Sequence, residues 1–153
     1  MSICENCSSA YLAGVFDSDG SLGIRKNRSR GTRSGYSYCP CASLTWLDNE
    51  RTRTVFAELM MRYGGNVTVA MHNGFPNRHP TIRYLTYAQN AARLAKAMLP
   101  HMKLKNRQAV LLLNLSEIQQ RNKKNTRKGI DWKVQDEIYL AIKKLAVKGP
   151  GKD

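Results

Sequence analysis

A short stretch near the start of the chain, Tyr11 to Gly20, has the pattern of an apolar helix that ends in two aspartates. Its larger apolar residues recur at helical spacing and predict one buried face. A glycine inside a helix costs about 1 kcal/mol relative to alanine, so a face of small residues predicts close packing against a second backbone. We expect Gly20 to end the helix in a left-handed conformation. The small face comprises Ala10, Ala13, Gly14 and Asp17.

The two acids, Asp17 and Asp19, lie where a helix disfavours negative charge. Exposed carboxylates near a helix C-terminus oppose the helix dipole by about 0.3 to 1 kcal/mol each. A bound cation would reverse that effect, and Mg²⁺ prefers one or two carboxylates together with water and substrate phosphates. The end of this helix therefore predicts part of a metal site that other groups complete.

Charge and length limit the classes of protein to consider. The 153 residues include 25 Lys and Arg against 11 Asp and Glu, a formal net charge of +14. Such an excess indicates a polyanionic partner, most often nucleic acid, although a basic structural protein is an alternative. The length fits one domain spanning 1–153. No apolar run has the length of a membrane span and no signal segment opens the chain, so we expect a soluble, intracellular protein.

The four cysteines form two close pairs, Cys4 with Cys7 and Cys39 with Cys41. Four thiolates can close a tetrahedral zinc site. The second pair disfavours zinc, because one intervening residue in a strand is fewer than the two to four that usually separate zinc ligands. We favour free thiols, with a disulfide as the second possibility.

Hydrophobic periodicity predicts an α+β fold with one antiparallel four-stranded sheet and helices on one face. A strand follows Gly20, and a basic turn joins it to a second strand. A helix then runs from a cap at Asp48 or Asn49 to two glycines, before a second hairpin. The expected later elements are the strand ranges 67–71 and 81–87, a helix ending at Pro100, a helix containing Leu104 to Leu115, a basic loop at 121–129, and a final helix at 130–147 capped by Asp131.

The open face of that sheet is expected to be basic and rich in hydroxyl groups. Leu44 and Trp46 should face the core, which leaves Ser43 and Thr45 for base edges in a major groove. The basic turn is either a solvated hairpin tip or an arm that binds phosphates, and we favour the arm. A register error of one residue would invert each assignment. The predicted DNA-binding residues are Arg25, Asn27, Arg28, Arg30, Arg33, Ser43, Thr45, Thr68, His72, Arg83 and Tyr84.

The segment Leu12–Gly20, LAGVFDSDG, resembles the motif that names the LAGLIDADG homing endonucleases, with departures at Val15, Phe16 and Ser18. The run Pro100–Gln108 also resembles a Pro-x-x-Lys-x-Lys stretch of family members with a single motif. The resemblance implies the αββαββα fold, whose sheet forms a DNA-binding saddle. It further implies an intron-encoded, site-specific DNA endonuclease that makes metal-dependent double-strand breaks with short 3′ overhangs at a long, near-palindromic site.

The same resemblance implies roles for individual residues. Asp19 and the backbone carbonyl of Ser18 would hold Mg²⁺, for which Mn²⁺ could substitute, while Asp17 would be structural. Lys105 would order the solvent around the attacking water. Related enzymes carry Gln and Arg near Asp48 and Thr52, so Asp48 is a third candidate catalytic residue, with Arg51 or Arg53 as substitutes for the arginine.

The chain contains one copy of the motif. The resemblance therefore implies a homodimer in which the small helix faces meet and each Asp19 lies beside the partner's. Two alternatives share the fold: a maturase that binds intron RNA, and a DNA-binding protein without catalytic activity.

Overall fold

The computed structural model describes residues 8–32, 34–70, 78–124 and 132–146. Helices and strands alternate as the sequence predicts, and the α+β class with the αββαββα order is confirmed. The elements are α1 (Ser9–Ser18), β1 (Gly20–Arg28), β2 (Tyr36–Leu47), α2 (Glu50–Tyr63), β3 (Asn66–Ala70), β4 (Thr81–Tyr87), α3 (Ala88–Met98), the 3₁₀ turn η2 (Leu99–His101), α4 (Asn106–Lys124) and α5 (Trp132–Ala146).

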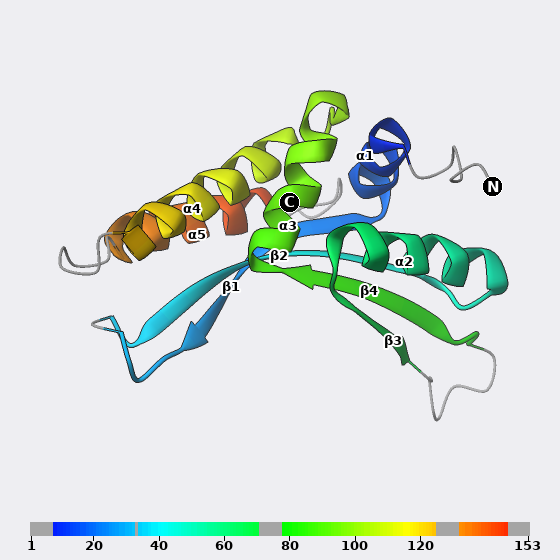
Figure 1. Cartoon of the computed structure of the whole chain (residues 1–153), viewed down its shortest axis with the longest axis horizontal. Coiled ribbons are helices and arrows are strands. Elements are labelled where there is room, and N and C mark those ends of the chain that lie inside the picture. Colours follow the sequence, from blue (N-terminus) through cyan, green and yellow to red (C-terminus); the bar gives the residue numbers. More distant parts are fainter. Residues whose placement is uncertain (1–7, 33, 71–77, 125–131, 147–153) are drawn as a thin grey trace, which may run out of the picture.

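The four strands form one antiparallel sheet in the order β1-β2-β4-β3. All helices lie on one side of this sheet, and the strands curve away from them toward both ends, so the other side is an open arch (Figure 1). Within the described residues, no helix is both long and apolar enough to cross a membrane.

The core lies between the sheet and the helices. Strand β2 alternates as expected, with Tyr38, Ala42 and Leu44 buried and the intervening residues more exposed. Side chains from all layers join one apolar cluster, including Phe16 of α1 and Phe56 of α2. Because side chains in a strand alternate between faces, this burial determines which residues remain on the open face.

Helix α2 is fixed at both ends. The Asn49 side chain caps its start by accepting a 2.9 Å hydrogen bond from the backbone N–H of Thr52. At its other end Gly64 adopts a φ of 61°, which favours glycine. The Tyr84 hydroxyl donates to the Gly64 carbonyl at 2.8 Å, and Thr86 donates to the Tyr63 carbonyl at 3.0 Å.

This arrangement shows that the prediction of Tyr84 as a DNA contact is wrong. The side chain is fully buried on the helix side of β4, and burial raises its pKa to about 12. Its neighbour Arg83 occupies the open face instead.

The prediction of a left-handed Gly20 is also wrong. Asp19 caps α1 with a φ of −115°, and Gly20 is the first residue of β1. Glycine is required here by packing, because a Cβ atom would lie 2.4 Å from Cδ1 of Phe16 and 2.7 Å from its Cα.

The predicted helix limits differ from those observed in the C-terminal part. Helix α4 begins at Asn106, so Leu104 lies in the preceding loop, with 74% of its surface exposed.

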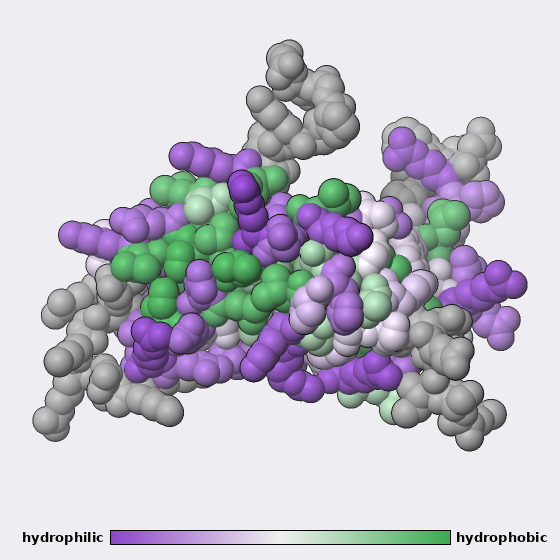
Figure 2. All heavy atoms as spheres, turned by 90° about the horizontal axis from the view of Figure 1, so that it is seen from above, coloured by the Kyte–Doolittle hydropathy of each residue, from purple (hydrophilic) through white to green (hydrophobic). Residues whose placement is uncertain are grey.

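From the helix side, apolar side chains form an interrupted band among hydrophilic ones (Figure 2). The predicted turn at 73–77, His72, most of the basic loop and the Asp131 cap lie outside the described residues.

Replacing Gly20 with alanine should destabilise the fold by about 2 kcal/mol, because the new methyl group must displace the backbone of α1. Urea unfolding of the Gly20→Ala protein tests this expectation. Gly31→Ala is the matched control, since a Cβ there meets nothing within 4 Å, and its stability should stay within about 0.5 kcal/mol of the unchanged protein. Equal stability of the two variants would contradict the packing argument.

Candidate nucleic-acid interface and helix-end carboxylates

The open face of the sheet collects the polar residues that the sequence assigned to base contacts. The register pairs Thr45 with Arg83 and Arg83 with Thr68, so these three side chains form one row across β2, β4 and β3. None of the four strands contains Asp or Glu. By strand alternation this face also includes Arg25, Asn27 and Ser43.

Arg25 is held in place on this face by an aromatic residue that the sequence analysis missed. Its Nη1 donates to the Tyr87 hydroxyl at 3.3 Å, and its guanidinium carbon lies 5.1 Å from the centre of the Tyr87 ring. Tyr87 has the same strand parity as Arg83, so strand alternation could have identified it. A stacked guanidinium loses less freedom when it binds a base or a phosphate.

The basic turn between β1 and β2 is closed by backbone and side-chain bonds. The Ser29 N–H donates to the Gly35 carbonyl at 2.8 Å, and the Thr32 hydroxyl donates to the Tyr36 carbonyl at 2.9 Å. Arg30 is exposed there, whereas Arg28 alternates to the other side of the ribbon from Asn27. Arg33 and His72 lie outside the described residues. Phosphate binding by this turn stays a prediction.

Two free thiols, Cys39 and Cys41, also lie on the open face. Burial raises the pKa of the Cys41 thiol, although the nearby charge of Arg25 acts in the opposite direction. The raised pKa favours the protonated thiol. Cys4 and Cys7, the other possible members of a zinc site, lie outside the described residues.

The two motif acids have different environments, and Asp17 is turned inward. Its Oδ2 accepts from the backbone N–H of Lys103 at 2.8 Å, and its Oδ1 accepts from that of Lys105 at 3.0 Å. Burial raises the pKa of Asp17, but hydrogen bonds from the backbone of residues 103–105 outweigh it and hold the pKa below 3.8. Asp17 therefore ties this loop to the motif helix as a carboxylate.

Lys105 completes a reciprocal connection between the loop and the helix. Its Nζ donates to the Phe16 carbonyl at 2.8 Å and also to the Gly20 carbonyl. A cation at a helix C-terminus interacts favourably with the helix dipole. Lys105, which was predicted to order solvent, thus fixes the backbone on both sides of Ser18 and Asp19.

Asp19, in contrast, is exposed at the end of α1. Its Oδ2 accepts a 3.2 Å hydrogen bond from Nε1 of Trp46, whose ring stacks on Phe56 with centroids 5.8 Å apart. Trp46 faces the helix side as predicted, but its contact with Asp19 was not anticipated. The sequence contained one indication of this contact, because the indole N–H of a partly buried tryptophan usually has a hydrogen-bond partner.

The small face of α1 differs in part from the prediction. Ala10 and Gly14 are exposed, and a Cβ on Gly14 would meet no other described part of the chain within 4 Å. Ala13 is fully buried in the core, so its assignment to a dimer interface is wrong. Asp17 is half-buried with its carboxylate bonded within the chain, and its place in a dimer interface stays a prediction. The free face instead continues through Tyr11 and Ser18.

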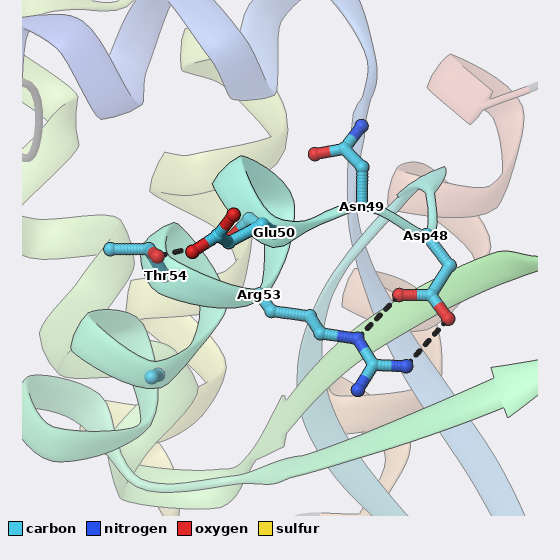
Figure 3. Close-up of a pocket in the computed structure, with 6 residues that line it drawn as sticks. Asp48, Asn49, Glu50, Arg53 and Thr54 are labelled. Carbon is cyan, nitrogen blue, oxygen red and sulfur yellow. Dashed lines mark hydrogen bonds and ion pairs between the residues drawn. The ribbon is translucent and has the colours of Figure 1, made fainter.

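A shallow groove opens at the start of α2 (Figure 3). Within it the Asp48 carboxylate accepts two bonds from Arg53, at 2.6 Å from Nε and 2.8 Å from Nη2. The Arg53 guanidinium lowers the pKa of the Asp48 carboxyl, while 61% of the Arg53 side chain remains exposed. A water-orienting role for Asp48 stays a prediction, and in the structure its carboxylate is paired with Arg53.

Among the described residues, no group of three or more His, Cys, Asp and Glu side chains could hold a metal ion. Asp19, an exposed carboxylate, belongs to no such group, and metal binding by Asp19 stays a prediction.

Comparisons with known proteins find similarity in structure only. No protein-family model matches the chain, and no curated protein matches it in sequence. The homing endonuclease I-CvuI in complex with its target is 19% identical, with a TM-score of 0.66 over 95% of this chain and 83% of that chain. The archaeal intron-encoded homing endonuclease I-Vdi141I complexed with DNA is 17% identical, with a TM-score of 0.65 over 95% and 87%.

The I-SmaMI LAGLIDADG homing endonuclease bound to cleaved DNA is 16% identical, with a TM-score of 0.62. The match covers 90% of this chain but only 43% of that chain. At these identities the similarity establishes a shared fold.

Replacing Asp17 with asparagine should destabilise the protein by about 2 kcal/mol at pH 7, because the amide NH₂ would face a backbone N–H. Since the folded carboxyl has the lower pKa, its contribution is complete above about pH 5 and is lost as the pH falls through the folded value. Urea unfolding between pH 2 and pH 7 measures the difference.

The matched control is Glu117→Gln, which removes a charge from an exposed pair with Arg121 and should change stability by less than about 0.5 kcal/mol. Equal stability of the Asp17→Asn and unchanged proteins at pH 7 would show that the carboxylate does not hold the loop.

Proposed function

Because this chain has the LAGLIDADG homing endonuclease fold, we propose that it is a site-specific DNA endonuclease that requires Mg²⁺ and acts as a homodimer. One observation supports this proposal most strongly. The acid-free open face of the sheet carries Arg25 and Arg83, and the exposed Asp19 lies directly before the first residue of β1. The surface proposed to read bases and the exposed Asp19 carboxylate are therefore contiguous in the chain.

The open face suits duplex DNA. A two-stranded ribbon fits the major groove, where arginine can bond guanine in bidentate fashion and hydroxyl groups can bond either donors or acceptors. Thr45, Arg83 and Thr68 form a row that would follow base edges, and Arg25 is pre-ordered by Tyr87. Two structures that share the fold are those of I-CvuI in complex with its target and of I-Vdi141I complexed with DNA.

The carboxylate chemistry fits a divalent ion. Mg²⁺ commonly takes one or two carboxylates and completes its shell with water and substrate phosphates. Asp19 would supply one carboxylate from each copy, and the resemblance adds the Ser18 carbonyl. Bound Mg²⁺ would polarise the scissile phosphate and lower the pKa of a water molecule.

The chain's own residues would keep this site in order. Trp46 orients the Asp19 carboxylate, and Lys105 restrains the carbonyl groups of Phe16 and Gly20 on either side of it. We propose that Lys105 acts as a positioning residue for the end of α1.

A second copy would provide the missing carboxylate. The free face of α1 places Gly14 where a partner helix can approach closely, since among the described residues a Cβ atom there would meet nothing within 4 Å outside its own stretch of helix. Tyr11 and the exposed Leu104 add apolar surface. Two such faces related by a twofold axis would bring the two Asp19 side chains together and would match a near-palindromic target.

Replacing Asp19 with asparagine should abolish cleavage, because it removes a charged metal ligand. DNA affinity should stay nearly unchanged, because asparagine has a similar size and position 19 lies outside the base-reading face. The measurement is cleavage and binding of a randomised duplex library with Mg²⁺, with EDTA as a control. The unchanged protein should cut a long, near-palindromic sequence and leave short 3′ overhangs.

Joint loss of binding and cleavage in the Asp19→Asn protein would instead make Asp19 structural. Metal-dependent cutting that persists in the variant would disprove its ligand role. If the unchanged protein binds a selected duplex without cutting it, the noncatalytic alternative is correct. If it binds only structured intron RNA, the maturase alternative is correct.

Replacing Gly14 with alanine should weaken self-association at least about tenfold, because the methyl group occupies the space needed by the partner helix. The same change should stabilise the isolated monomer by about 1 kcal/mol through helix propensity. Sedimentation velocity and urea unfolding separate the two effects, with Gly31→Ala as control. A more stable protein with unchanged self-association would exclude α1 from the dimer interface.

A further inference from the structure

A single carboxylate from α5 joins both strands of the β1–β2 ribbon. Lys26 and Tyr38 are directly paired across the two strands. Oδ1 of Asp136 accepts from Lys26 Nζ at 2.9 Å and from the Tyr38 hydroxyl at 2.6 Å. These three residues are named the ribbon latch.

Aromatic rings surround the latch. The Lys26 ammonium lies 4.6 Å from the ring centre of Tyr36 and 5.5 Å from that of Tyr139, which comes from α5. The Tyr139 and Tyr38 rings are 5.9 Å apart. Helix α4 adds a further contact, because the Gln119 side chain donates to the Tyr38 carbonyl. Helices α4 and α5 therefore both contact the strand pair of Lys26 and Tyr38.

The charge states agree with this geometry. The hydrogen bond to Asp136 raises the pKa of Lys26, and the bonds from Tyr38 and Lys26 lower the pKa of Asp136. Burial and the bond to Asp136 raise the pKa of Tyr38. The latch is therefore an ammonium, a carboxylate and a neutral phenol at neutral pH.

The latch lies directly behind residues of the open face. Arg25 with Cys39 and Asn27 with Ser37 are the strand pairs on either side of Lys26 with Tyr38. Neighbouring residues in a strand point to opposite faces, so Asp136 holds the ribbon from behind while Arg25 and Asn27 face the other way. Any tilt of the ribbon about this point would move both of those side chains.

The latch is also remote from the helix-end carboxylates. Six residue steps separate Gly20 from Lys26, or about 20 Å along β1. The start of β1 is restrained by Lys105 and α1, whereas the latch restrains its far half. The two supports act on different parts of the same strand.

We propose that Asp136, through Lys26 and Tyr38, positions the β1–β2 ribbon on DNA and so determines base discrimination at the target positions farthest from the cleaved bonds. This inference rests on the proposed function. Asp136 is a positioning residue in this role, because its contacts reach DNA only through the ribbon.

The first test compares target selection by the unchanged protein and the Asp136→Asn protein from a randomised duplex library. We expect discrimination to fall about tenfold at the outer positions of each half-site and to stay unchanged at the inner positions. Lys26→Arg keeps a cationic donor and should retain more discrimination than Lys26→Met.

Two controls on α5 separate positioning from general stability. Glu137→Gln removes a neighbouring exposed charge outside the latch, and Ile142→Val weakens the buried packing of the same helix. Both variants should keep the full discrimination profile. A similar loss of outer discrimination in Ile142→Val would overturn the inference, because it would show that any weakening of α5 has the same effect.

The second test needs no DNA. Hydrogen exchange of the ribbon amides should become about tenfold faster in Asp136→Asn than in the unchanged protein, with β3 and β4 unaffected. Unchanged exchange would overturn the inference. So would faster exchange accompanied by unchanged discrimination, or by equal loss at every position, since the latch would then be structural only.

The two tests also distinguish this inference from the proposed function. If the unchanged protein selects no sequence, the proposed function fails and this inference fails with it. If the unchanged protein selects and cuts a target while Asp136→Asn has the same profile, only the latch inference fails.

Discussion

The reciprocal bonds between the end of α1 and the loop at 103–105 are the contacts on which the rest of the site depends. Asp17 accepts from Lys103 and Lys105, which lie 86 and 88 residues further along the chain, and Lys105 donates back to α1. Because Asp17 has backbone N–H partners, it remains charged despite partial burial. This connection sets the direction in which α1 ends, and therefore the position of Asp19.

The sheet that begins directly after Asp19 presents an open surface beside it. One face of each strand packs into the apolar core, so the alternate residues must lie on the open face. The core therefore determines the composition of the opposite surface, where Arg25 and Arg83 lie among hydroxyl groups with no acidic strand residue. A surface of that kind attracts a polyanion and repels few of its phosphates.

Strand β1 connects the two parts of the proposed mechanism. Its first residue follows Asp19, and its far half carries Arg25 and Asn27 in front of the latch formed with Asp136. Because an extended strand covers a nearly fixed distance per residue, the two supports hold the ends of β1 at a set separation. Reading bases and cutting phosphates would then be set by the same strand, held by α1 at one end and by α5 at the other.

The sequence by itself determined the order of helices and strands, a helix between a cap at Asp48 or Asn49 and the two glycines 64–65, the helix end with two aspartates and the side of the sheet for Ser43, Thr45 and Arg83. These features depend on local periodicity and turn chemistry, which short stretches of chain contain. Only the tertiary structure decided that Tyr84 and Ala13 are buried, that Asp17 faces inward, that Trp46 bonds Asp19 and that Asp48 bonds Arg53. The physical reason is that each of these depends on a partner brought in by packing or on one residue of register, and periodicity specifies a face without specifying what lies against it.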